Sequence, residues 1–190
     1  MKPAIHPNKG RQDGYILIAA MVMLLVLTFL GISMYRSFTS QENMAANSKE
    51  KARAFQVAQS TLQYGEYLLA TTQASLVQGG TCATATPLTT ATICQNAVNI
   101  LSATSNKPMT LGNGLPYSTM NILLPVNSSG GAGNYYGNPQ FYIQYLGISP
   151  DGAGQLYQVT ALAYGGNSSA VAVVQSTFET SSGIKNLGGL

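Results

Sequence analysis

Very few side chains in this sequence are of the types that carry out acid–base, nucleophilic or metal chemistry. The single histidine is His6, and only 8% of the residues are charged. The acidic residues are scattered along the chain, at Asp13, Glu42, Glu50, Glu66, Asp151 and Glu179. An enzyme needs perturbed acids, or a nucleophile beside a base, gathered in one pocket. The sequence therefore predicts no enzymatic activity, no cofactor and no metal site.

The two cysteines are the remaining reactive groups. Cys82 and Cys94 have 11 residues between them. A close, even pair of cysteines in an exported chain is typical of a disulfide. The alternative is a pair of free, buried thiols. We expect the bridge, which for a loop of this length would stabilise the fold by about 3 kcal/mol in the loop-closure model.

Export is predicted by the N-terminal segment. From Gly14 to Tyr35 no side chain is charged, and the 20 residues 15–34 form a continuous apolar run. As a helix this run would be about 30 Å long, which matches the hydrocarbon core of a bilayer. The residues before it are basic, and basic flanks stay in the cytoplasm, so the rest of the chain faces outward. From Tyr15 onward six positive and five negative residues leave a charge of only +1, which gives little support to nucleic-acid binding.

The helical pattern continues past the apolar run. No proline occurs between Pro7 and Pro87, and apolar or small residues recur at three- and four-residue steps, which indicates one buried helix face. The sequence thus predicts a single helix from Tyr15 to about Ala70, about 84 Å long. Gly31 beside Ser33 is either an ordinary small residue or the site of a local bend. The expected buried stripe is Phe55, Ala58, Leu62, Gly65 and Leu69.

The C-terminal part of the chain reads as antiparallel strands. Three β-type segments, 140–148, 155–164 and 170–179, are separated by short turns rich in Gly, Asn, Asp and Ser. Residues 71–139 read as a loop-rich insertion that holds the Cys82–Cys94 clip. The fold class is therefore α+β, with a long N-terminal helix packed on a C-terminal antiparallel β-sheet. Tyr142, Tyr157 and Tyr164 are expected in the sheet core, whereas Tyr135-Tyr136 lie in a Gly/Asn-rich loop and are candidates for a contact surface.

Two stretches resemble a known family. Gly14, an aromatic residue and Ile-Leu-Ile, followed by an unbroken helix, are similar to type IV pilins. The stretch 42–47 (ENMAAN) with 52–59 (ARAFQVAQ) resembles the E-x-M-A-x-N…A-x-x-A-F-x-A-A-E block of the PilX family of minor pilins, and departs from it at Val57 and Gln59. The last hairpin, within 159–178, is also similar. The resemblance covers roughly residues 9–69 and 140–179.

The resemblance implies chemistry at the N-terminus and a pilin fold. A prepilin peptidase would cut after Gly14, where a residue without Cβ lets the backbone enter the cleft, and would methylate the new amine of Tyr15. An ordinary secretory signal peptide is the alternative, but the apolar run is too long for one. The expected segments are a leader at 1–14, a transmembrane and filament-core half-helix at 15–35, an amphipathic half-helix at 36–70, the insertion at 71–139, strands at 140–182 and a tail at 183–190.

The fifth residue after the cut is Ala19, where major pilins carry a glutamate. In the usual account that carboxylate pairs with the amine of the subunit ahead. A subunit that lacks it can only accept a glutamate from behind, so we expect a priming subunit at the tip of a type IV pilus. The alternatives are a minor subunit along the shaft, a type II secretion pseudopilin and a single-pass anchored surface adhesin.

The resemblance also implies partners and a location. The partners would be other minor and major pilins, a tip adhesin-like protein, the inner-membrane assembly platform and the prepilin peptidase. The chain would first span the bacterial inner membrane with its soluble domain in the periplasm, and would then pass into an extracellular pilus that serves adhesion or twitching.

Overall fold

The computed structural model describes residues 13–72, 77–78, 80–101, 110–129, 133–152 and 154–181. The expected leader up to residue 12 and the expected tail 183–190 lie outside these residues. The described chain divides into two compact units, which meet between Ala46 and Asn47. We describe each unit by itself.

One helix, α1 (Asp13–Thr72), is by far the longest element. It begins two residues before the predicted start and ends two residues after the predicted end. The helix runs through Gly31 and Ser33 without a break. Threonine hydroxyls inside it donate to carbonyls one turn back, from Thr28 to Leu25 (2.7 Å) and from Thr39 to Tyr35 (3.0 Å), so these polar groups are satisfied within the helix.

The buried face of α1 matches the expected stripe except at Phe55. Ala58, Gly65 and Leu69 are buried as predicted, and Leu62 is half-buried. Phe55 was expected on this face, but its side chain is 47% exposed, and the neighbouring Ala54 is fully buried instead. Both 54-58-61-65-68 and 55-58-62-65-69 follow helical spacing. The buried positions are those of the first set together with Leu69.

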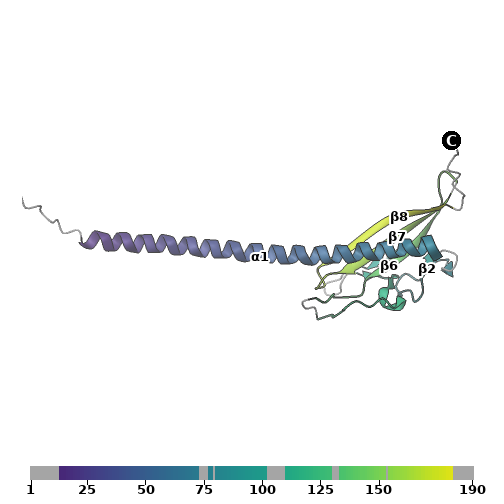
Figure 1. Cartoon of the computed structure of the whole chain (residues 1–190), viewed down its shortest axis with the longest axis horizontal. Helices are drawn as coiled ribbons and strands as arrows, with labels where there is room; N and C mark the ends of the chain where they lie inside the picture. Colours follow the sequence, from purple (N-terminus) through teal and green to yellow (C-terminus); the bar gives the residue numbers. More distant parts are fainter. Residues whose placement is uncertain are drawn as a thin grey trace, which may run out of the picture. The chain divides into compact units, whose positions relative to one another are not determined.

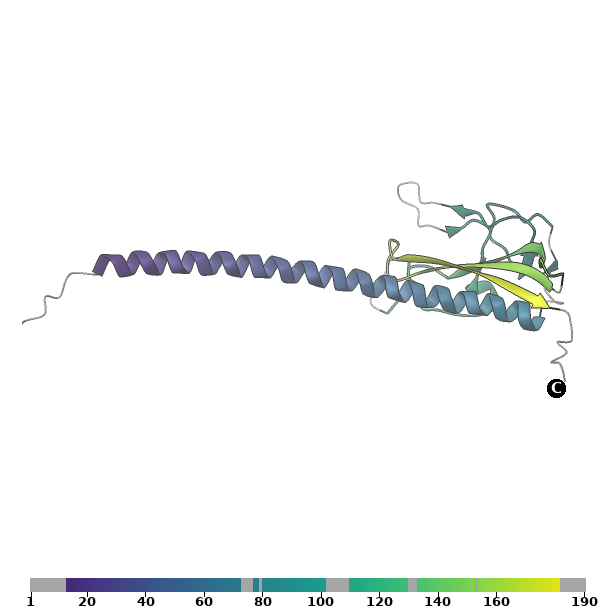
Figure 2. The ribbon, with the colours of Figure 1, turned by 90° about the horizontal axis from the view of Figure 1, so that it is seen from above.

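Three long strands form most of the sheet. They are β6 (Gln140–Ile148), β7 (Gly154–Tyr164) and β8 (Val171–Ser181), and they pair antiparallel in the order of the sequence, as predicted. A β-bulge interrupts the β6–β7 register between Tyr145 and Gly147. The part of α1 that follows Asn47 runs along this sheet (Figures 1 and 2).

The insertion contributes strands that the sequence did not reveal. It contains β1 (Val77–Gln78), β2 (Thr92–Cys94), β3 (Ile100–Leu101), β4 (Thr110–Leu111), β5 (Leu115–Pro116) and the 3₁₀ helix η2 (Tyr117–Met120). β2 pairs parallel with β6 and with β1, whereas β5 pairs antiparallel with β6. The fold is α+β as predicted, but the sheet is mixed rather than entirely antiparallel, with the order β1-β2-β6-β7-β8.

Residues of the central strands alternate between two apolar cores. One core joins Leu68 and Leu69 of α1 to Phe141, Ile143 and Val159 of the sheet. The second core gathers Tyr142, Leu162 and Tyr164 with Cys94 and Leu111 from the insertion. Burial on both faces explains why the end of β7 reads as an almost continuous apolar run rather than an alternating one. Tyr142, Tyr157 and Tyr164 are buried, as predicted.

Candidate functional site

The N-terminal part of α1 carries the largest apolar surface among the described residues. Every large apolar side chain from Tyr15 to Phe38 is between 50% and 77% exposed. By length and composition, one helix of the described chain, Gly14–Thr71, is able to cross a membrane. Such a surface is unfavourable in water and needs lipid or other apolar helices around it.

The residues expected to undergo processing lie at the start of this helix. Gly14 and Tyr15 are in the first turn of α1, and no atom lies within 4 Å of a Cβ built on Gly14. Ala19 is exposed and stands four residues after Tyr15, on the same face of the helix. The first carboxylate after this turn is Glu42. Asp13, the first residue of α1, belongs to the expected leader, and from Tyr15 up to Glu42 the helix presents no acidic side chain to a neighbouring helix.

Farther along, α1 lies very close to the sheet at Gly65. A Cβ at this position would lie 2.7 Å from Cγ1 of Val159 and 3.5 Å from Cδ2 of Phe141. Tyr64, on the preceding position, packs edge-on against Tyr117 (5.6 Å between ring centroids) and Phe141 (6.0 Å). Next to it, Ser176 of β8 donates a 2.5 Å hydrogen bond to Oε1 of Glu66. These contacts fix the helix on the sheet.

A second anchor ties the helix to the β7–β8 turn. The backbone N–H of Gly166 donates to Oε2 of Glu50 (2.5 Å), and Nη1 of Arg53 lies 3.0 Å from both oxygens of the same carboxylate. The hydrogen bond from Gly166, followed by the contribution of Arg53, lowers the pKa of Glu50 against the opposing effect of burial. Glu50 is therefore a carboxylate at neutral pH, and its role is structural.

Arg53 extends this anchor to the loop before β6. Its Nη2 donates to the carbonyl of Asn134 (3.0 Å), and its guanidinium lies 4.7 Å from the ring centroid of Tyr135. Tyr136 packs edge-on against Tyr164 with 5.5 Å between the ring centroids. Tyr135 and Tyr136, which the sequence suggested as a contact surface, are half-buried and hold their own loop in place.

The insertion is closed by the predicted disulfide between Cys82 and Cys94. Cys94 is fully buried in the second core, beside Tyr142 and Leu162. The side chain of Asn96 accepts from the N–H of Cys82 (2.7 Å) and donates to its carbonyl (3.1 Å). The bridge therefore links β2 to the loop that precedes it.

Comparison with known families agrees with this architecture. Residues 78–180 match the family described as type IV pilus assembly protein PilX C-term, and residues 14–63 match PilX N-terminal. The C-terminal match alone spans more than half of the chain. The chain belongs to the PilX family of type IV pilus assembly proteins. No curated protein and no solved structure matches the chain.

Membership in the PilX family indicates what the apolar half-helix contacts. PilX proteins are structural components of type IV pili, so the chain interacts with other pilus components, and its exposed N-terminal helix fits a membrane-anchored pilin. The structure brings Tyr15 and Ala19 onto one helix face and joins Cys82 to Cys94.

Sequence reasoning missed the Glu50–Arg53 anchor of this PilX protein. A glutamate and an arginine three residues apart on a helix predict only a local ion pair. The glycine pair Gly165-Gly166 was a possible signal, because a turn without side chains can approach a helix closely. The sequence alone does not say which helix residue it meets.

Proposed function

We propose that the chain is a minor pilin that primes assembly of a type IV pilus and occupies its tip. The observation that carries the proposal is that α1 has no acidic side chain from Tyr15 up to Glu42, with Ala19 on the same helix face as Tyr15. After cleavage behind Gly14, the amine of Tyr15 would add a positive charge to the positive end of the helix dipole. A glutamate from the subunit behind would neutralise that amine in an apolar surrounding.

Ala19 has no carboxylate with which to neutralise the N-terminal amine of a subunit ahead. A subunit at the front of the filament has no amine ahead of it to neutralise, so the missing carboxylate costs nothing there. Within the shaft, the same substitution would leave the ammonium of the next subunit unpaired at the filament axis, which is unfavourable in a low-dielectric environment. This asymmetry favours the tip over the shaft.

Assembly itself would exchange one apolar environment for another. In the inner membrane, with the C-terminal unit in the periplasm, lipid would cover the half-helix 15–35. In the pilus, the helices of other minor and major pilins would replace the lipid. Since both surroundings are apolar, close packing between helices, rather than the hydrophobic effect, would drive the exchange. The prepilin peptidase, the assembly platform and a tip adhesin-like protein are the further partners in this proposal.

The position in the filament tests the proposal directly. Immunogold labelling of native pili with antibodies against the C-terminal unit should give particles at one end of each fibre, and deletion of the gene should reduce the number of pili. In an Ala19→Glu variant, particles should also appear along the shaft. Labelling distributed along wild-type shafts would refute the tip position, and normal pilus numbers in the deletion strain would refute priming.

A further inference from the structure

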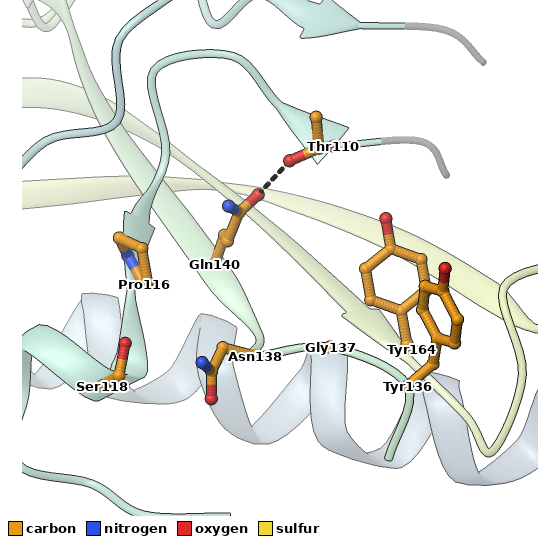
Figure 3. Close-up of a pocket in the computed structure, with 8 residues that line it drawn as sticks. All are labelled: Thr110, Pro116, Ser118, Tyr136, Gly137, Asn138, Gln140 and Tyr164. Atoms are coloured by element: carbon orange, nitrogen blue, oxygen red, sulfur yellow. Dashed lines mark hydrogen bonds between the residues drawn. The ribbon is translucent and has the colours of Figure 1, made fainter. Parts of the chain in front are cut away.

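A hollow of about 470 Å³ lies beside the N-terminal end of β6 (Figure 3). Its volume falls within the range of about 300–1,000 Å³ that is usual for ligand sites. Among the described residues that line it, none has an acidic or basic side chain. The polar side chains around it are hydroxyls and carboxamides, from Thr110, Ser118, Tyr136, Asn138, Gln140 and Tyr164.

Several of these polar groups are not used by the fold. Oε1 of Gln140 accepts from the hydroxyl of Thr110 (2.8 Å) and from the N–H of Leu111 (3.0 Å), which fixes this side chain in the wall of the hollow. Its amide nitrogen, the carboxamide of Asn138 and the hydroxyl of Ser118 have no hydrogen-bond partner in the part of the chain that the structure describes. Donors and acceptors that line a hollow and have no partner are available to a ligand.

The aromatic wall adds a second observation. Tyr164 is only 5% exposed, and its hydroxyl is buried without a partner among the described residues. Buried hydroxyls are nearly always hydrogen-bonded, so an unpaired one calls for an explanation. The Tyr136 and Tyr164 hydroxyls point in the same direction in Figure 3. A Cβ on Gly137 would lie 3.1 Å from the Tyr164 ring, so this glycine keeps the backbone against the wall.

We propose that this hollow binds a neutral glycan. A sugar presents hydroxyls that both donate and accept, which suits free carboxamides and hydroxyls. It also presents apolar C–H faces, which suit the half-buried ring of Tyr136. Because no described lining residue is charged, the hollow favours a neutral ligand over a phosphorylated or carboxylated one. A peptide bound through its main chain needs a free strand edge, but Gln140 of β6 is already paired with Pro116 on one side and Leu162 on the other.

This binding goes beyond the proposed role in priming, because it gives the C-terminal unit a ligand of its own. A subunit displayed at the end of a fibre would be well placed to use such a site on a glycan-covered surface. Binding of one or two sugar units through a few hydrogen bonds is weak, and several subunits or sites on one surface would be needed for firm attachment.

The test uses the purified full-length chain on an immobilised panel of neutral and sialylated oligosaccharides. The detergent must not carry a sugar head group, so an amine-oxide detergent is suitable. We expect binding to at least one neutral glycan, and affinity is then measured for that glycan by titration calorimetry. Asn138→Ala and Ser118→Ala should each weaken binding at least tenfold, because each removes a group that no other part of the described fold uses.

Asn47→Ala is the matched control, since Asn47 is an exposed asparagine on α1 that lies outside this hollow. It should bind as the parent does. All three variants should melt at the temperature of the parent and support normal numbers of pili, which separates this proposal from the one on priming. Failure to bind any neutral glycan, equal binding by Asn138→Ala and the parent, or a preference for sialylated glycans would overturn it.

Discussion

The close contact between Gly65 of α1 and Val159 of the sheet gives a sharp test of how the C-terminal unit is held together. In an exposed helix, Gly65→Ala would stabilise the protein by about 1 kcal/mol, because alanine favours the helix more than glycine does. Here the added Cβ would lie 2.7 Å from Cγ1 of Val159, which is too close for any real contact. The neighbouring groups must therefore move.

Movement is costly at this position. Val159 is fully buried, its β-branched side chain has few rotamers, and Phe141 lies on the other side of the added carbon at 3.5 Å. Overpacking of a core costs about 1–3 kcal/mol. After the gain of about 1 kcal/mol in helix propensity, Gly65→Ala should lower the free energy of unfolding by up to about 2 kcal/mol.

The assay is thermal unfolding of the full-length chain in detergent, followed by the near-ultraviolet circular dichroism of the buried tyrosines. A loss of 1 kcal/mol corresponds to about 2–4 °C in a chain of this size. Gly31→Ala is the matched control, because no atom lies within 4 Å of a Cβ at Gly31, and it should not destabilise the protein.

A double variant isolates the contact itself. Val159→Ala removes the methyl group that the new Cβ meets, so Gly65→Ala combined with Val159→Ala should be less destabilised than the sum of the two single variants. A favourable coupling energy of about 1 kcal/mol or more is expected for residues in direct contact. If Gly65→Ala stabilises the protein as much as it would stabilise an isolated helix, Gly65 is not in close contact with Val159.

Three further predictions concern the other anchors. Reduction of the Cys82–Cys94 disulfide should lower the free energy of unfolding by about 3 kcal/mol, measured as a fall in Tm with dithiothreitol that a Cys82→Ser/Cys94→Ser variant does not show. The folded protein lowers the pKa of Glu50, so this carboxylate stabilises the fold at pH values above its unfolded pKa. The stabilisation is lost as the pH falls through the folded pKa. The Tm of Glu50→Gln should therefore depend less on pH in the acid range than the Tm of the parent. Gly165→Ala should cost about 2–3 kcal/mol by chemical denaturation, because the new Cβ would meet the backbone carbonyl of Glu50, which cannot rotate away; a variant as stable as the parent would contradict this packing.

Much of the fold was predictable because its signals are local. The apolar run, the absence of proline and the turn residues define α1 and the three long strands within two residues at most of their ends. The apolar half-helix is predicted by a continuous run of apolar residues, and the disulfide is predicted by two cysteines close together in the sequence. These features were visible without knowledge of any tertiary contact.

The features that were missed depend on contacts between distant segments. β2 is only three residues long, and nothing in Thr92–Cys94 says that it pairs parallel with β6. Phe55 was placed on the buried face because two neighbouring stripes fit the helical period equally well, and only the position of the sheet decides between them. The Glu50 anchor likewise joins residues 116 positions apart.

We propose that the apolar half-helix enters a pilus after its leader has been removed. Intact mass spectrometry of the protein from sheared surface pili would show this. We expect a chain that begins at Tyr15 with a methyl group on its amine and retains the Cys82–Cys94 disulfide. A chain that keeps Gly14 and the residues before it, or one cut at another position, would rule out this processing.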